Sequence, residues 1–128
     1  MKAGSWGDLS WTSFSKPKAA FDFTNRNKIC FYDCGSHPLK KEVIPTLYAD
    51  LTKSNFLNTY TSRNPYEDFA DTFAFYVMFN TVASITYSLD TQQGAVYDIR
   101  KQLASDRMKP KVDYVKAFLA GASIKYPD

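Results

Sequence analysis

The sequence has very little histidine: His37 is the single one among 128 residues. Zinc hydrolases of the two-histidine type bind their metal through a pair of histidines four residues apart on one helix, in the motif His-Glu-x-x-His. The sequence does not contain this motif, so it lacks two of the ligands that such a site requires. His37 lies in a Gly-Ser-His-Pro stretch typical of turns, and we expect it in an exposed loop.

Other catalytic motifs are missing as well. The sequence has no Gly-x-Ser-x-Gly elbow, which argues against a serine hydrolase of the α/β type. It has no glycine-rich loop of the kind that cradles phosphates. A cysteine–histidine nucleophile would need His37 beside Cys30 or Cys34, and catalytic pairs of that kind are usually far apart in sequence.

Long runs of one residue class are also absent. The 16 basic and 13 acidic residues give a net charge of +3, and the basic residues are spread along the chain. A nucleic-acid surface needs clustered basic residues, so we expect no nucleic-acid partner. No apolar run is long enough to cross a bilayer, and residues 1–6 lack the apolar core of a signal peptide. We therefore expect no membrane span, and the compartment stays open.

Two cysteines, Cys30 and Cys34, have a spacing that is unusual for zinc knuckles and for redox motifs. Three interpretations remain: two buried free thiols, a local disulfide, or half of a metal site. A disulfide would indicate an oxidising compartment.

Aromatic side chains are plentiful, with ten Phe, nine Tyr and two Trp. This is enough apolar bulk for a packed core, and the length suits one domain covering residues 1–128. The patterns predict a mainly α domain with a less regular, partly β amino-terminal third. We expect a strand over 28–32, a helix over 39–52 that starts or kinks near Pro45, a short β excursion over 84–89, renewed helical spacing at Val96, Ile99 and Leu103, an interruption at Pro110, and a last helix over 111–120.

The clearest predicted element is a helix over 64–80. Asn64 is a favourable N-cap, Pro65 suits the first helical position, and Glu67 stands three residues after the cap. Apolar residues cover nearly every face of this helix, which is typical of a buried helix.

Glu67 and Asp71 lie four residues apart, on one face of this helix. One interpretation is structural: Glu67 caps its own helix, Asp68 shares that turn, and Asp71 pairs with a nearby Lys or Arg. The other is a zinc site. In such sites a glutamate from a later helix is the third ligand, and an acid one turn on holds a ligand histidine by its other ring nitrogen.

The stretch Asn-Pro-Tyr-Glu-Asp-Phe-Ala-Asp-Thr-Phe-Ala-Phe-Tyr-Val, residues 64–77, resembles the glutamate helix of glutamate-type zinc metallopeptidases. It is similar to the sequence Glu-Asp-Phe-Ala-Glu-Thr-Phe found in many bacterial members of that group. Residues 54–60 resemble the segment that precedes the helix in those proteins. The resemblance is good over 54–79, and Gly-Asp-Leu-Ser-Trp at 7–11 faintly resembles the segment after the two-histidine helix. It implies a zincin-like carboxy-terminal subdomain.

The resemblance also implies roles for three residues. Glu67 would be the third zinc ligand, and Asp71 would accept a hydrogen bond from the second ring nitrogen of a ligand histidine. Lethal-factor-like and proline-specific peptidases place a tyrosine seven residues before the ligand, where Tyr60 stands, and its hydroxyl would donate a hydrogen bond to the oxyanion. A simpler role for Tyr60 is a packing anchor under the helix. Zinc is expected for the complete family domain rather than for this chain alone, and the substrate would be a peptide or protein.

The sequence fits several origins and several kinds of domain. The chain fits the carboxy-terminal part of a larger peptidase, or a degenerate relative that kept the fold and lost the metal. Two further possibilities are a non-catalytic helical module that binds a peptide or protein in an aromatic groove, and an unrelated helical domain in which Glu67 is only a cap. If the chain is a fragment, we expect exposed apolar surface and self-association.

Overall fold

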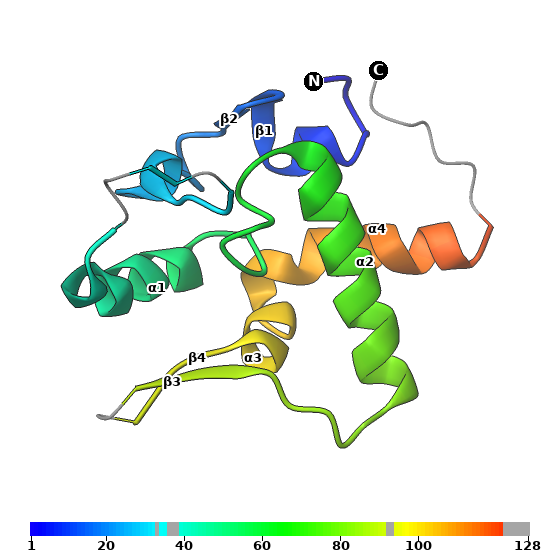
Figure 1. The fold of residues 1–128 in the computed structure, drawn as a ribbon. Helices are drawn as coiled ribbons and strands as arrows, with labels where there is room; N and C mark the ends of the chain where they lie inside the picture. The colour runs from blue at the N-terminus through cyan, green and yellow to red at the C-terminus, as the bar shows by residue number, and fades with distance from the viewer. Residues whose placement is uncertain (33, 36–38, 92–93, 122–128) are drawn as a thin grey trace.

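Four α-helices supply most of the regular structure in the part of the chain that the computed structural model describes, residues 1–32, 34–35, 39–91 and 94–121 (Figure 1). They are α1 (Ile44–Lys53), α2 (Pro65–Thr81), α3 (Ile99–Leu103) and α4 (Lys109–Leu119). The prediction of a mainly α fold is confirmed.

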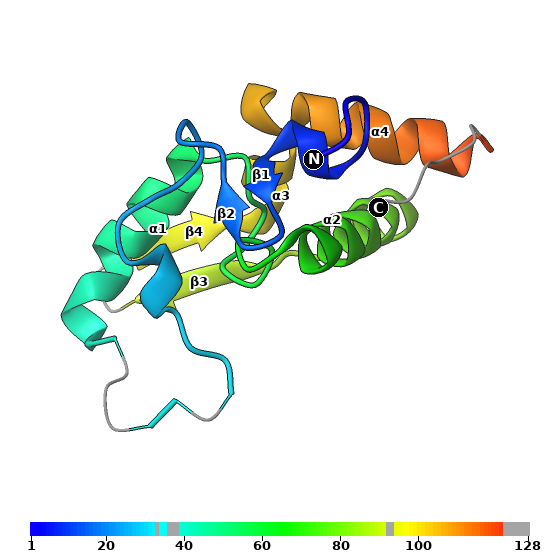
Figure 2. The same ribbon diagram turned by 90° about the horizontal axis from the view of Figure 1, so that it is seen from above.

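The remaining elements are short. The 3-10 turns are η1 (Gly7–Leu9), η2 (Arg26–Lys28), η3 (Lys41–Val43) and η4 (Asp106–Met108). Two antiparallel hairpins are formed by β1 (Trp11–Ser13) with β2 (Lys16–Pro17), and by β3 (Ser88–Thr91) with β4 (Gly94–Asp98). The second hairpin packs along α1, as the view in Figure 2 shows.

The strand predicted over 28–32 is wrong. Residue 28 ends η2, and residues 29–32 are irregular. Cys30 and Cys34 form a disulfide with a Cα–Cα distance of 5.4 Å. A fully extended chain would separate their Cα atoms by about 13 Å, and the backbone bends at residues 31 and 32. Of the three interpretations of the cysteines, the structure has the local disulfide.

The predicted β excursion lies a few residues too early. Residues 84–87 contain no strand, and the hairpin runs from Ser88 to Asp98. Val96 lies in β4 rather than in a helix. The helix starts only at Ile99, because the Asp98 side chain caps it by accepting a hydrogen bond from the Lys101 N–H at 3.0 Å.

Prolines stand in the first turns of three helices. Pro45 is the second residue of α1, so that helix begins near the proline as predicted. Pro110 does not interrupt a helix, because it lies in the first turn of α4, where its missing N–H would have no helical partner anyway. Pro65 opens α2.

The predicted cap of α2 is confirmed. The Asn64 Oδ1 accepts hydrogen bonds from the backbone N–H groups of Tyr66 at 3.0 Å and Glu67 at 3.1 Å. Two N–H groups that have no partner within the helix are thereby satisfied.

Replacing this cap should destabilise the fold. We expect Asn64→Ala to lower the free energy of unfolding by about 1 kcal/mol, measured by urea denaturation. Asn80→Ala is the matched control, since the Asn80 side chain donates to the Tyr76 carbonyl near the end of the same helix and caps no N–H group. Equal losses in the two variants would contradict the capping role.

Helix α2 is not buried on all sides, contrary to the expectation from its apolar composition. Its buried residues form one stripe, Pro65, Asp68, Thr72 and Phe79, whereas Tyr66 is 56% exposed. The stripe faces α3 and α4, and the helix lies along one side of the molecule (Figure 1). Its aromatic residues Phe69, Phe73, Phe75 and Tyr76 are half-buried, and Phe75 and Tyr76 pack against the core.

The main core lies where α1, α2, α3 and the second hairpin meet. It contains Trp11, Leu51, Phe56, Leu57, Phe79, Tyr97, Ile99, Leu103 and Met108. The connection between α1 and α2 passes through this core, so its carbonyls need internal partners. The buried amide of Gln102 supplies them by donating to the carbonyls of Ser54 at 3.1 Å and Phe56 at 3.0 Å.

A buried ion pair joins α2 to α4. The Lys111 ammonium lies 2.7 Å and 2.8 Å from the two carboxylate oxygens of Asp68, and both side chains are 0% exposed. Lys111 also donates to the Asn55 carbonyl at 2.6 Å, and the Trp11 indole N–H donates to Asp68 at 3.0 Å. The ammonium lies 4.5 Å from the Phe56 ring centroid. Asp68 lies in the first turn of α2 as predicted, and there it forms a buried ion pair that the sequence did not reveal.

Burial acts on both charges of this pair. Desolvation raises the pKa of Asp68, and the Lys111 ammonium and Trp11 indole act in the opposite direction. Desolvation likewise lowers the pKa of Lys111, opposed by the Asp68 carboxylate. The charges are therefore tolerated inside only because each has several hydrogen-bond partners.

Removing one partner should be costly. We expect Lys111→Met to lower the free energy of unfolding by about 3–5 kcal/mol, because it leaves a buried carboxylate unpaired. Lys109→Met is the matched control on the same helix: Lys109 pairs with Asp113 at 2.7 Å on the exposed surface, and its loss should be close to neutral. Thermal and urea unfolding of both variants measure the difference, and similar losses would refute the anchoring role.

Candidate functional site

Tyr60 and Glu67 lie together at the start of α2. Tyr60 belongs to the connection before the helix, Glu67 to its first turn, and both side chains are half-buried. A hydrogen bond with the Tyr32 hydroxyl, partial burial, and the neighbouring Glu67 carboxylate raise the pKa of Tyr60 to about 12. The phenol is therefore a neutral hydrogen-bond donor at physiological pH, beside a carboxylate.

Asp71 lies one turn further along α2, with its carboxylate held by a neutral partner. The Asn58 amide donates to Asp71 Oδ2 at 2.9 Å. The Asn58 Oδ1 in turn accepts from the Thr61 N–H at 2.8 Å, and the Thr61 hydroxyl donates to the Asn58 carbonyl at 2.8 Å. This reciprocal turn fixes both the connection and the orientation of Asp71. Among the described residues Asp71 has no Lys or Arg partner, contrary to the structural interpretation of its role.

The disulfide loop packs against Tyr60. The Phe31 ring lies 5.0 Å from the Tyr60 ring at an interplanar angle of 78°. The Arg63 guanidinium carbon lies 5.3 Å from the Phe31 centroid and 5.6 Å from the Tyr60 centroid. Tyr60 thus packs as an anchor through its ring while its hydroxyl points to polar partners, so the two interpretations of this residue are compatible.

A cavity of about 380 Å³ opens beside Asp71, where α1, α2 and the second hairpin meet. Five of its eleven lining residues are aromatic and one is a carboxylate: Tyr48, Asn58, Thr59, Tyr60, Asp71, Phe75, Tyr87, Ser88, Leu89, Tyr97 and Ile99. The predicted residues Tyr60 and Asp71 therefore share a cavity, and Glu67 lies beside Tyr60 outside this lining.

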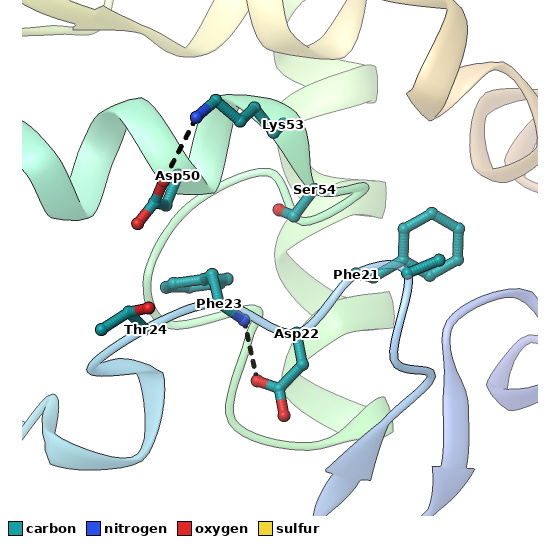
Figure 3. Close-up of a pocket in the computed structure, with 8 residues that line it drawn as sticks. Phe21, Asp22, Phe23, Thr24, Asp50, Lys53 and Ser54 are labelled. Carbon is teal, nitrogen blue, oxygen red and sulfur yellow. Dashed lines mark hydrogen bonds and ion pairs between the residues drawn. The ribbon is translucent and has the colours of Figure 1, made fainter.

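A second cavity, of about 440 Å³, lies between residues 20–24 and the end of α1 (Figure 3). Both of its carboxylates already have partners. Asp22 accepts from the Phe23 N–H at 2.9 Å and from the Arg26 guanidinium at 2.7 Å, and Asp50 lies 3.4 Å from the Lys53 ammonium. None of the predicted site residues lines this cavity.

The described residues do not form a complete zinc site. No three His, Cys, Asp or Glu side chains come together within the described ranges, and His37 lies outside them. Glu67 is a single carboxylate, whereas a catalytic zinc site takes three protein ligands. The same ranges hold no helix that is long and apolar enough to cross a membrane.

Comparisons with known proteins give no match to a family model, to a curated protein or to a solved structure. The function of the chain must therefore be inferred from the sequence of α2 and from the geometry around Tyr60, Glu67 and Asp71.

The contacts of three residues, Asn58, Tyr32 and Lys111, were not predicted from the sequence. Asn58 carries a local signal, since an Asn three residues before a Thr favours a turn closed by side-chain hydrogen bonds. Tyr32 and Lys111 carry no such signal, because their partners Tyr60 and Asp68 are distant in sequence.

The surroundings of Tyr60 predict an abnormal titration. By NMR of ring-labelled tyrosine, with Tyr60→Phe for assignment, we expect the Tyr60 phenol to stay mainly protonated at pH 11. Tyr32→Phe and Glu67→Gln should each lower its pKa towards 10, because each removes a neighbour that raises it. The raised pKa stabilises the folded state fully below about pH 10, and this contribution disappears as the pH rises through about 12. An ordinary pKa for Tyr60 in the wild-type chain would contradict the described surroundings of the phenol, with Tyr32 and Glu67 as its neighbours.

Proposed function

We propose that this chain supplies the glutamate-bearing part of a zinc metallopeptidase site and is inactive by itself. Glu67 is the zinc ligand, Asp71 supports the site from the next turn, and Tyr60 is the hydrogen-bond donor. The observation that carries the proposal is the sequence of α2, whose residues 64–77 resemble the glutamate helix of such peptidases, with Tyr60 seven residues before Glu67 and near enough for the Glu67 carboxylate to raise its pKa.

The chain around Glu67 is suited to this role. The Asn64 cap fixes the first turn of α2, so the position of Glu67 is set by the helix rather than by a loose loop. The ion pair of Asp68 with Lys111 fixes the adjacent face of the same turn on α4. Asp71 is oriented by Asn58. Metal sites depend on such support, because ligands must be held in place before the metal binds.

The ligand set remains incomplete in this chain, since its sequence has a single histidine. Two histidines must therefore come from another segment. Bound zinc would act as a Lewis acid and activate a water molecule. The residues of this chain would contribute one ligand and a neutral phenol donor.

A non-catalytic peptide-binding module is the second candidate. The cavity of about 380 Å³ favours it, because an aromatic lining with a few polar groups is typical of ligand sites. In this case Glu67 is a first-turn acid that stabilises the helix, and no metal is needed.

Zinc calorimetry tests the proposal. We expect the chain alone to bind Zn²⁺ weakly, and to bind it tightly once a helical peptide carrying His-Glu-x-x-His is added. Glu67→Gln should abolish this gain, because it replaces the anionic ligand by a neutral amide. Glu42→Gln is the control, because Glu42 is the other glutamate of the sequence and lies exposed in η3.

If the chain is the carboxy-terminal part of a longer peptidase, we expect the genomic codons ahead of Met1 to encode the natural version of that peptide. An in-frame His-Glu-x-x-His within a few dozen codons is the expected finding, and the peptide should be taken from it. A gain in zinc affinity that Glu67→Gln leaves unchanged would contradict the role of Glu67.

A further inference from the structure

We infer that the cavity beside Asp71 is a binding site for an organic cation, the ammonium or guanidinium end of a basic side chain. Three features of the cavity favour a cation: its aromatic walls, its single carboxylate, and its size. Zinc takes no part in this site, because Glu67 is not among the lining residues.

The aromatic walls come from separate elements. Tyr48 of α1 and Tyr97 of β4 form one pair, with ring centroids 5.1 Å apart at an angle of 46°. Phe75 of α2 and Tyr87, just before β3, form another, at 5.5 Å and 75°. Ring faces carry negative electrostatic potential and attract cations, and they also pack against the methylene stem of a lysine or arginine.

Tyr97 holds its wall in place. Its hydroxyl donates to the Leu57 carbonyl, and its side chain is 7% exposed. Burial raises the pKa of Tyr97 above its usual range, so this ring stays uncharged at physiological pH. Tyr87, in contrast, is 57% exposed and leaves the cavity open to a ligand.

Asp71 is the carboxylate in the lining. Its partner is the neutral Asn58 amide at 2.9 Å, and no Lys or Arg of the described segments forms an ion pair with it. The negative charge is thus oriented but not neutralised. The other carboxylates of α2 differ, because Asp68 is paired with Lys111 and Glu67 neighbours Tyr60. A cation entering the cavity would gain both a charge-assisted hydrogen bond and contact with the rings.

The size suits one side chain. A volume of about 380 Å³ lies at the lower end of ligand-site volumes and is small for a folded partner. Anions are disfavoured by Asp71, and a neutral aliphatic side chain would leave its carboxylate without a counter-charge. A basic side chain, free or in a peptide, meets all three features.

The cation site is distinct from the proposed zinc site, and Asp71 has a different role in each. In a complete peptidase site Asp71 supports a ligand histidine, whereas here it contacts the cation directly. The chain without zinc or added peptide therefore tests the cation site alone.

Calorimetry with small probes is the experiment. The probes are capped arginine, capped citrulline as its neutral isostere, and butylguanidinium as the bare cation. We expect millimolar or tighter binding of capped arginine, and at least tenfold weaker binding of capped citrulline. Equal affinity for butylguanidinium and capped arginine would assign the site to cations in general, and stronger binding of capped arginine would assign it to peptide side chains.

Variants locate the binding. Asp71→Asn should weaken capped arginine at least tenfold and keep the fold by circular dichroism, since an amide oxygen can still accept from Asn58. Tyr87→Leu should weaken it severalfold by removing one ring. Glu42→Gln is the control, because it removes one negative charge from exposed η3, outside the lining of the cavity, and it should leave the affinity unchanged.

Three results would overturn the inference: no binding of capped arginine at millimolar concentration, equal binding of citrulline, or an affinity that Asp71→Asn leaves unchanged. Failure of the zinc experiment would not affect these results, because Zn²⁺ and Glu67 take no part in them. Cation binding that is lost in Glu42→Gln but kept in Asp71→Asn would place the cation elsewhere and also refute the inference.

Discussion

The carboxylate of Asp68 and the ammonium of Lys111 meet in the interior, and the remaining packing is arranged around them. Neither group is exposed, and both are satisfied by further hydrogen bonds, from the Trp11 indole to Asp68 and from Lys111 to the Asn55 carbonyl. A buried pair of this kind tolerates little displacement, because each lost contact leaves a charge unsolvated. It therefore fixes β1, the connection after α1, α2 and α4 relative to one another.

The connection between α1 and α2 links this buried ion pair to the residues of the site. Its backbone carbonyls are bound by buried side chains from distant elements, the Ser54 and Phe56 carbonyls by Gln102 and the Leu57 carbonyl by Tyr97. Next in the chain, Asn58 holds Asp71, and Tyr60 lies beside Glu67. A segment without regular structure is thus positioned by hydrogen bonds to buried side chains. Such positioning is what a ligand or catalytic site needs from the backbone that carries it.

The proposed zinc site and the inferred cation site lie on neighbouring parts of one surface. Glu67 lies beside Tyr60, which lines the cavity, and Asp71 lies in the lining itself. In a peptidase, a cavity next to the metal is a natural place for a substrate side chain. In a non-catalytic module the same cavity would bind a basic side chain without any chemistry. The disulfide loop contributes Phe31 and Tyr32 to the surroundings of Tyr60, so an oxidising compartment would favour this arrangement.

The sequence by itself determined the local features: the cap and start of α2, the position of Pro45 near the start of α1, the mainly helical content, and the spacing that brings Glu67 and Asp71 to one face. These depend on contacts within a few residues, where residue type and period carry the signal. Only the tertiary structure decided that Asp68 is the buried acid, that Asn58 holds Asp71, and that Cys30 bonds to Cys34. It also showed that α2 buries one stripe only. The partners Lys111 and Asp68 lie 43 residues apart, and no local pattern reveals which of several acids on a helix will meet a distant lysine in the interior.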